Sequence, residues 1–213
     1  MISLQTYIHE AIKRLPKSVD GIIVFDIDDT LLKVNPDVVR IYKQIPGKGE
    51  ISLTTEEFAK DPDAKDPEKK KWFDLRDFRD PIKVYNSIIS GTPLIKNLKI
   101  MDAYIAAGYD FCFLTARSCE EVVKKALYDF LKVRDKSGNL HKLGDEFKQT
   151  LSHAINDEYK NYPGHTDAEK KANVLRDLCK KYDKVIFVDD DTKNTQAARD
   201  LNISNLTVIK AWE

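Results

Sequence analysis

The feature that most limits the fold of this chain is a set of four short, nearly continuous apolar runs: Gly21–Asp26, Asp110–Thr115, Lys184–Asp189 and Leu206–Lys210. A strand that is apolar at almost every position is typical of a parallel sheet covered on both faces. Helical patterns separate these runs, and two of them begin with capping boxes, Ser118 with Glu121 and Thr166 with Glu169. Buried strands that alternate with capped helices predict an α/β doubly wound domain with a central parallel sheet.

A first interruption of this alternation extends from Val34 to about Pro93. Its β-branched run and the turn Pro46-Gly47-Lys48-Gly49 predict a β-hairpin, although Asn35-Pro36 could instead start a helix. A short helix is expected after Thr54, and Asp61–Lys71 reads as a charged surface loop. We therefore expect a core domain, residues 1–33 and 94–213, and an insertion, residues 34–93, made of a flap hairpin and a small cap.

A second interruption covers Arg134 to Pro163. It contains a turn at Lys136–Asn139 and a pattern that favours a helix from Asp145 to Tyr159, and it shows no convincing strand. Near the start of the chain, apolar residues at helical spacing predict a further helix from Leu4 to Leu15.

Composition limits the partners. The 213 residues include 35 basic and 35 acidic ones, so the net charge is zero and gives no long-range attraction to nucleic acid or membranes. A nucleic-acid end is a conceivable substrate that the charge does not support. The opening residues do not resemble a signal peptide, and Gly21–Phe25 is too short an apolar run to cross a bilayer. Three cysteines without metal-like spacing fit a reducing compartment, so we expect a cytoplasmic protein, in a cell or an infected host, of undetermined oligomeric state.

Three carboxylates lie within four residues at the end of the first run: Asp26, Asp28 and Asp29. Parallel sheets bind ligands at the carboxyl ends of their strands, where these residues are expected. Crowded carboxylates repel one another unless a cation or a shared proton relieves them, and oxygen ligands without histidine or thiolate favour Mg²⁺. The simpler alternative is an aspartate-rich turn that caps the next segment.

Two other strands end in polar residues, and one helix carries an unusual lysine. The second run ends at Thr115, and the third ends at Asp189 and Asp190, with Asn194 beyond. Lys171 shares the apolar stripe of its helix, where an unpaired buried charge would be costly, whereas Lys170 points off that stripe. Lys171 is therefore a candidate partner of the carboxylates, unless its side chain extends outward from the helix start.

This ordered set resembles the haloacid dehalogenase superfamily, which has DxDx(T/V) after the first strand, Ser or Thr after the second, a helical Lys and a later acidic pair. Here these are Asp26–Thr30, Thr115, Lys171 and Asp189-Asp190. The resemblance covers Gly21–Lys33 and Ile95–Lys210 and implies a Rossmann-like three-layer domain with a flap and a cap. A weaker likeness is to phage-encoded proteins of this superfamily.

The resemblance also implies roles. Asp26 would be the nucleophile, Asp28 the general acid and base, and Thr115 and Lys171 would bind the phosphoryl group and balance its charge. Mg²⁺ would be held by Asp26, the main-chain carbonyl of Asp28 and Asp190, with Asp189 in support. Further substrate contacts are expected from Thr30, Ala116 and Arg117.

The expected activity is Mg²⁺-dependent hydrolysis of a small phosphomonoester or nucleotide through an aspartyl-phosphate. Alternatives are a polynucleotide-end phosphatase and a non-enzymatic scaffold such as a component of a phage particle. A nucleic-acid-processing domain of the toprim kind would have a Glu on its first strand and its DxD on a later one, the reverse of the order here, and a receiver domain would have its phosphoacceptor in the middle of the chain. Arg76, Arg79 and Arg117 are candidates to bind a second anionic group, although exposed arginines are usually solvated. The aromatic residues of the cap, among them Trp72 and Phe78, more often form a core than stack on a base.

Overall fold

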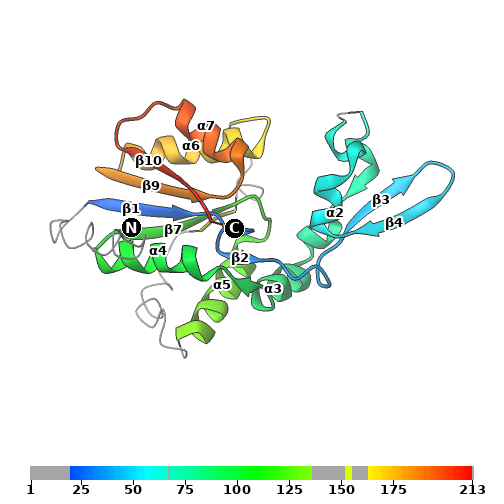
Figure 1. The fold of residues 1–213 in the computed structure, drawn as a ribbon, viewed down its shortest axis with the longest axis horizontal. Helices are drawn as coiled ribbons and strands as arrows, with labels where there is room; N and C mark the ends of the chain where they lie inside the picture. Colours follow the sequence, from blue (N-terminus) through cyan, green and yellow to red (C-terminus); the bar gives the residue numbers. More distant parts are fainter. Residues whose placement is uncertain (1–19, 67, 136–151, 155–162, 213) are drawn as a thin grey trace, which may run out of the picture.

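The computed structural model describes residues 20–66, 68–135, 152–154 and 163–212 (Figure 1). Its main body is built on a five-stranded parallel sheet with the strand order β10–β9–β1–β7–β8. The strands are β1 (Gly21–Phe25), β7 (Asp110–Thr115), β8 (Ser152–Ala154), β9 (Lys184–Asp189) and β10 (Leu206–Lys210). The four strands predicted from the apolar runs are therefore confirmed as β1, β7, β9 and β10.

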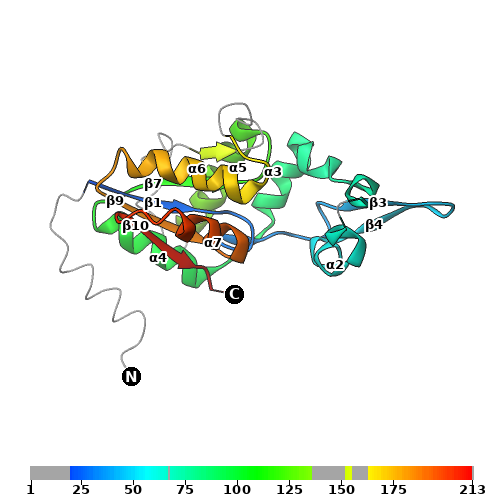
Figure 2. The ribbon, with the colours of Figure 1, turned by 90° about the horizontal axis from the view of Figure 1, so that it is seen from above.

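Helices cover both faces of this sheet, giving three layers (Figures 1 and 2). Because successive side chains of a strand point to opposite faces, Ile23 and Phe25 pack with one helical layer, and Ile22 and Val24 pack with the other. The first layer contains α4 (Ile95–Ala106) and α5 (Glu120–Asp135), and the second contains α6 (Asp167–Cys179) and α7 (Thr192–Asp200). The predicted α/β architecture with a central parallel sheet is thus present. Among the described helices, none combines the length and the apolar character needed to cross a membrane.

The two predicted capping boxes have different outcomes. At α6, the Thr166 side chain accepts from the Glu169 N–H and the Glu169 side chain accepts from the Thr166 N–H, as predicted. At α5, the predicted box is wrong because the helix begins at Glu120, one residue later than the pattern requires. Cys119 has a φ of 65°, which is incompatible with the first helical position.

Strand β8 lies in the segment where a helix from Asp145 to Tyr159 was expected, and that prediction is wrong over Ser152–Ala154. These residues pair in parallel with Phe113–Thr115 of β7, so backbone pairing with the sheet edge outweighs local helical pattern. A three-residue strand is too short to show a period-two pattern. The remainder of that expected helix, the turn at 136–139 and the N-terminal helix at 4–15 lie outside the described residues.

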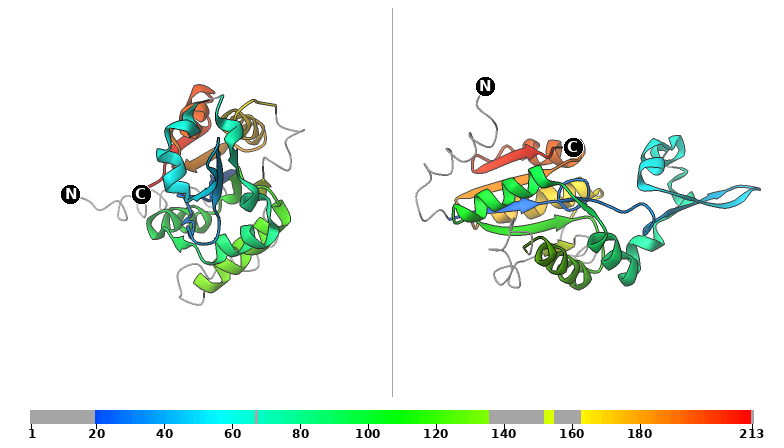
Figure 3. Two further views of the ribbon diagram at one scale, coloured as in Figure 1. Left: turned by 90° about the vertical axis from the view of Figure 1, so that its right-hand side faces the viewer. Right: turned by 60° about the horizontal axis from the view of Figure 1, so that its bottom comes forward.

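A smaller lobe lies beyond the carboxyl ends of β1 and β9 (Figures 1 and 3). It contains the predicted hairpin, β3 (Ile41–Ile45) and β4 (Gly49–Leu53), so the alternative helix at Asn35-Pro36 does not form. Short elements complete it: α2 (Thr55–Lys60), the 3-10 turns η1 (Pro62–Lys65), η2 (Lys70–Trp72) and η3 (Arg76–Arg79), and β5 (Phe73–Asp74), which pairs with β3. The helix expected after Thr54 is confirmed as α2, with a complete capping box.

Charged residues organise this lobe. Lys43 of β3 is 8% exposed, and its Nζ lies 2.6 Å from Asp61 Oδ2 and 2.9 Å from Asp63 Oδ2. Beside it, Phe58 and Phe73 make an edge-to-face contact. The segment Asp61–Lys71, expected as a surface loop, is therefore tied at its start to the hairpin by buried ion pairs.

The lobe joins the main body through two chain crossings that pair as β2 (Leu32–Lys33) and β6 (Thr92–Pro93). Gly91 permits this approach, because a Cβ there would lie 2.8 Å from Leu32 Cδ1. Between the lobe and β6, α3 (Pro81–Ile89) packs Val84 and Ile88 into the same core cluster as α5. Helix α3 thus belongs to the main body, whereas the expected boundary at residue 93 places it in the cap.

Candidate active site

The carboxyl ends of three adjacent strands bring the predicted acidic residues together. Asp26 directly follows β1, and its N–H donates to Val188 O of β9 at 3.0 Å. Asp189 ends β9, and Thr115 ends β7 on the other side of β1. Chain segments far apart in sequence therefore meet at one edge of the sheet, as the order of the motifs predicted.

Lys171 joins two of these carboxylates. Its Nζ lies 2.7 Å from Asp26 Oδ1 and 2.7 Å from Asp189 Oδ2, and the residue is 2% exposed. Burial alone would lower the pKa of Lys171, but the charges of Asp26 and Asp189 outweigh this effect and raise it. The outward-pointing alternative for Lys171 is therefore wrong, and Lys170 lies instead 3.8 Å from Asp167.

Burial raises the pKa of the Asp26 carboxyl well above its usual value. Lys171 opposes this shift, while Asp189 and Asp28 add to it by charge repulsion. Lys171 occupies Oδ1 of Asp26, which leaves Oδ2 for other chemistry. Asp26 is thus a buried, crowded carboxylate whose free energy falls when positive charge approaches.

Asp189 is fully buried, and several donors hold its carboxylate. Besides Lys171, the Asp191 N–H donates to Oδ1 at 2.8 Å and Asn194 Nδ2 lies 3.0 Å from Oδ2. These contacts support the expected secondary role of Asp189. The hydrogen bond from Asn194 to Asp189 could not be predicted from the sequence, which shows only a polar residue in the helix that follows the acidic cluster.

Asp190 is more accessible, and its carboxylate is linked to the first motif. Thr30 Oγ1 donates to Asp190 Oδ1 at 3.0 Å. Burial, with repulsion from Asp189, raises the pKa of Asp190 to about 6. The Thr30 hydroxyl uses its one proton in the hydrogen bond to Asp190, so it links the two loops and is not available to donate to a substrate.

One oxygen from each of Asp26, Asp189 and Asp190 lies within 4.8 Å of the other two. Among the described residues, the Lys171 ammonium pairs with two of these three carboxylates, Asp26 and Asp189, so an excess of negative charge remains. An oxygen-only donor set, in which the pKa values of Asp26 and Asp190 are raised, suits a hard divalent cation such as Mg²⁺, whose charge would relieve the repulsion. The Asp28 side chain is not part of this cluster, so the structure supports no ligand role for its carboxylate.

Asp28 is held by Arg117 instead. Arg117 Nε donates to Asp28 Oδ2 at 2.9 Å, and Nη2 donates to Oδ1 at 2.6 Å. Arg117 is 3% exposed and its Nη1 donates to Ser87 Oγ of α3 at 2.8 Å. The Arg117 guanidinium, which we expected to bind the substrate, is thus already engaged by Asp28 and Ser87. Ser87 gave no signal in the sequence, because it lies within an ordinary helical pattern.

Thr115 is fully buried at the end of β7, and its hydroxyl oxygen accepts from the Arg117 N–H at 3.1 Å. A hydroxyl that accepts one hydrogen bond can still donate its own proton, and no described residue receives it, so it can serve an anion at the strand ends.

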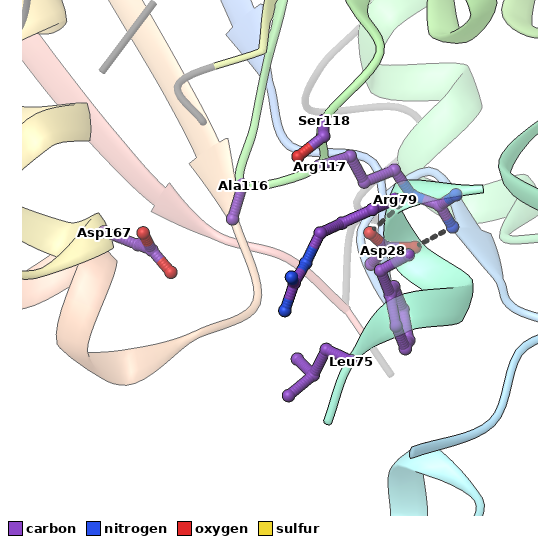
Figure 4. A pocket seen from close by; sticks show the side chains of 8 residues that line it. Asp28, Leu75, Arg79, Ala116, Arg117, Ser118 and Asp167 are labelled. Atoms are coloured by element: carbon purple, nitrogen blue, oxygen red, sulfur yellow. Dashed lines mark hydrogen bonds and ion pairs between the residues drawn. The ribbon is translucent and has the colours of Figure 1, made fainter. Parts of the chain in front are cut away.

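A cleft of about 540 Å³ lies between the main body and the lobe (Figure 4). It is lined by Asp28, Leu75, Phe78, Arg79, Ala116, Arg117, Ser118 and Asp167. Figure 4 shows Arg79 extending into this space between Asp28 and Asp167. Arg76 is engaged elsewhere, since it pairs with Glu50 and stacks on the Tyr42 ring at 3.7 Å. Of the three candidate arginines, Arg79 has the side chain that projects into the cleft and stays exposed, with its Nη2 at 3.9 Å from Asp74 Oδ1.

No protein-family model matches this chain, and no curated protein matches it either. The assignment of a function therefore depends on the geometry of the site.

Proposed function

We propose that this chain is a Mg²⁺-dependent phosphomonoester hydrolase of the haloacid dehalogenase type, with Asp26 as its nucleophile. The observation that carries the proposal is the buried bridge from Lys171 to both Asp26 and Asp189, with the Asp190 carboxylate alongside. A structural acidic turn would not need a buried lysine supplied by a separate helix. A covalent mechanism needs a carboxylate held in place with charge neutralisation at hand.

In the first step, Asp26 Oδ2 attacks phosphorus while Lys171 holds Oδ1. The bond from phosphorus to the ester oxygen breaks, and that oxygen keeps the electron pair and takes a proton from Asp28. In the second step, water attacks the aspartyl-phosphate and gives its proton to Asp28. This releases inorganic phosphate and restores the Asp26 carboxylate. Thr115 donates its hydroxyl proton to a phosphoryl oxygen in both steps.

Mg²⁺ bound by Asp26 and Asp190 would neutralise the charge of the phosphoryl oxygens. The substrate enters through the cleft below the lobe, whose size fits a small phosphomonoester or a nucleotide. Arg79 is placed to meet a second anionic group of such a substrate.

The test is hydrolysis of para-nitrophenyl phosphate by the purified chain with Mg²⁺ and with excess EDTA. We expect activity with Mg²⁺ that EDTA removes, and that Asp26→Asn lowers by at least about a thousandfold without loss of fold. The matched control is Asp29→Asn in the same acidic loop. Asp29 is exposed with a φ of 55°, which asparagine tolerates, so this variant should keep most activity. An inactive wild type would favour a non-enzymatic scaffold instead.

A further inference from the structure

We propose that Arg117 is a positioning residue that fixes the Asp28 carboxylate for proton transfer, and that Ser87 of α3 fixes Arg117 in turn. The inference rests on the proposed function and deepens it, because it assigns to the acid–base group an orienting partner from outside the motif loops. It also replaces the expectation that Arg117 serves mainly to bind the substrate.

The contact between Arg117 and Asp28 restricts orientation as well as distance. Two N–H groups on one edge of the guanidinium reach the two carboxylate oxygens, at 2.9 Å and 2.6 Å. Such a paired contact fixes the plane of the carboxylate, whereas a single contact leaves it free to rotate. The Asp28 side chain is 34% exposed and lines the cleft, so it would otherwise be free to change rotamer.

The arginine is the rigid member of this pair. Its side chain is 2% exposed, and its Nη1 donates to Ser87 Oγ at 2.8 Å. Ser87 is fully buried, and its hydroxyl donates to Val84 O at 2.8 Å, which directs the oxygen lone pairs toward Arg117. Because Val84 and Ile88 anchor α3 in the main core, this support is as rigid as the core itself.

The two possible roles of Arg117 predict different kinetics. A residue that binds the phosphoryl group affects every substrate, in KM as well as in kcat. A residue that acts through Asp28 affects the proton delivered to the leaving oxygen. In the first step it therefore matters for an alkyl phosphate, whose leaving alkoxide needs a proton, and matters little for para-nitrophenyl phosphate, whose leaving phenolate is stable without one. In the second step Asp28 takes a proton from water for both substrates, so the two esters are compared by kcat/KM, which reports only the steps up to release of the leaving group.

The experiment compares para-nitrophenyl phosphate with glycerol 2-phosphate for wild type, Arg117→Lys, Asp28→Asn and the double variant. Lysine keeps the charge but lacks the two-pronged contact. We expect Arg117→Lys to lower kcat/KM for glycerol 2-phosphate by about 10- to 100-fold and to change kcat/KM for the para-nitrophenyl ester by less than about threefold. In the Asp28→Asn background, Arg117→Lys should lower kcat/KM for glycerol 2-phosphate by less than about threefold, because the effects of mutating two residues that act as a unit do not add.

A second variant tests the same role in case Arg117→Lys disturbs folding. Ser87→Ala removes one hydroxyl from the buried side of α3 and should reproduce the leaving-group selectivity at a few-fold scale. Tyr85→Phe removes another hydroxyl from the same helix, one that donates to Asp129 at 2.7 Å, away from Asp28. It should leave the ratio of the two rates unchanged.

Equal losses of kcat/KM on both esters, a rise in KM alone, or multiplicative losses of kcat/KM in the double variant would each overturn the role of Arg117 while leaving the hydrolase function standing. A wild type inactive on both esters would overturn both proposals.

Discussion

Thr30 and Asp190 connect the two acidic loops by a reciprocal pair of hydrogen bonds. The Thr30 hydroxyl donates to Asp190 Oδ1 at 3.0 Å and accepts from the Asp190 N–H at 2.9 Å. One side chain thus fixes both the backbone and the carboxylate of Asp190, the more accessible of the proposed metal ligands.

Thr30→Val keeps the shape of the side chain but removes both hydrogen bonds. Because it leaves the Asp190 N–H without its partner, we expect the free energy of unfolding to fall by about 1–3 kcal/mol. Mg²⁺ should also bind more weakly. Urea denaturation and a Mg²⁺ titration followed by melting temperature measure the two effects. Thr207→Val, at an exposed position of β10, is the control and should change stability by less than about 0.5 kcal/mol.

Lys171→Met leaves Asp26 and Asp189 as buried carboxylates without their shared cation. We expect a loss of about 3–5 kcal/mol in the free energy of unfolding of the metal-free protein, together with loss of turnover. Chemical denaturation measures the first effect and a phosphatase assay the second. Lys180→Met, which breaks an exposed pair with Asp177 at the end of the same helix, should cost under about 1 kcal/mol. Equal costs for both variants would contradict the buried bridge.

Mg²⁺ should raise the melting temperature by mass action, and this rise should shrink as the pH falls from about 7.5 to about 5. The pKa of Asp190 is about 6 in the folded chain, against a usual value of 3.8. In the metal-free protein, the folded state binds this proton more tightly than the unfolded state does. The resulting gain in the free energy of unfolding is complete below pH 3.8 and is lost as the pH rises through about 6. Mg²⁺ competes with that proton for Asp190. The stabilisation by Mg²⁺ should therefore increase as the pH rises, while the stabilisation by the proton decreases. Asp190→Asn should remove most of the rise in melting temperature that Mg²⁺ causes. A melting temperature that does not change with Mg²⁺ at any pH would contradict the proposed metal site.

Arg79→Ala should change the ranking of substrates without altering the chemical step. We expect kcat/KM for phosphomonoesters with a second anionic group to fall about tenfold or more, because a charge-assisted contact contributes about 1.5–3 kcal/mol. The rate on para-nitrophenyl phosphate should stay within about threefold. Arg76→Ala is the matched control, since its guanidinium pairs with Glu50 outside the cleft. A uniform loss in both variants would show that the lobe acts through stability alone.

Elements with a strong local signal could be predicted from the sequence. Strand β1 is buried at every position because both of its faces are covered, and this produces the continuous apolar run that revealed it. Lys171 could be predicted because a charge on an apolar stripe needs a partner. The hairpin was marked by its glycine-rich turn.

The features that were missed depend on tertiary contacts. Strand β8 is held by the edge of β7, and its three residues carry no pattern of their own. The Arg117–Asp28 pair joins residues 89 positions apart, and the Ser87 hydroxyl that supports it resembles any other polar residue in a helix. The hydrogen bonds between Thr30 and Asp190 could not be predicted because Asp190 lies in a loop far away in sequence.

The hydrogen bonds that assemble the site join residues very far apart in the chain. Asp26 meets Lys171 across 145 positions, and Thr30 meets Asp190 across 160. During synthesis, the DxDxT segment therefore leaves the ribosome long before its partners exist, and its carboxylates stay solvated until β9 joins the sheet. Closing such long loops is slow, so we expect phosphatase activity to be among the last properties to return when the denatured chain refolds, after helical circular dichroism has recovered.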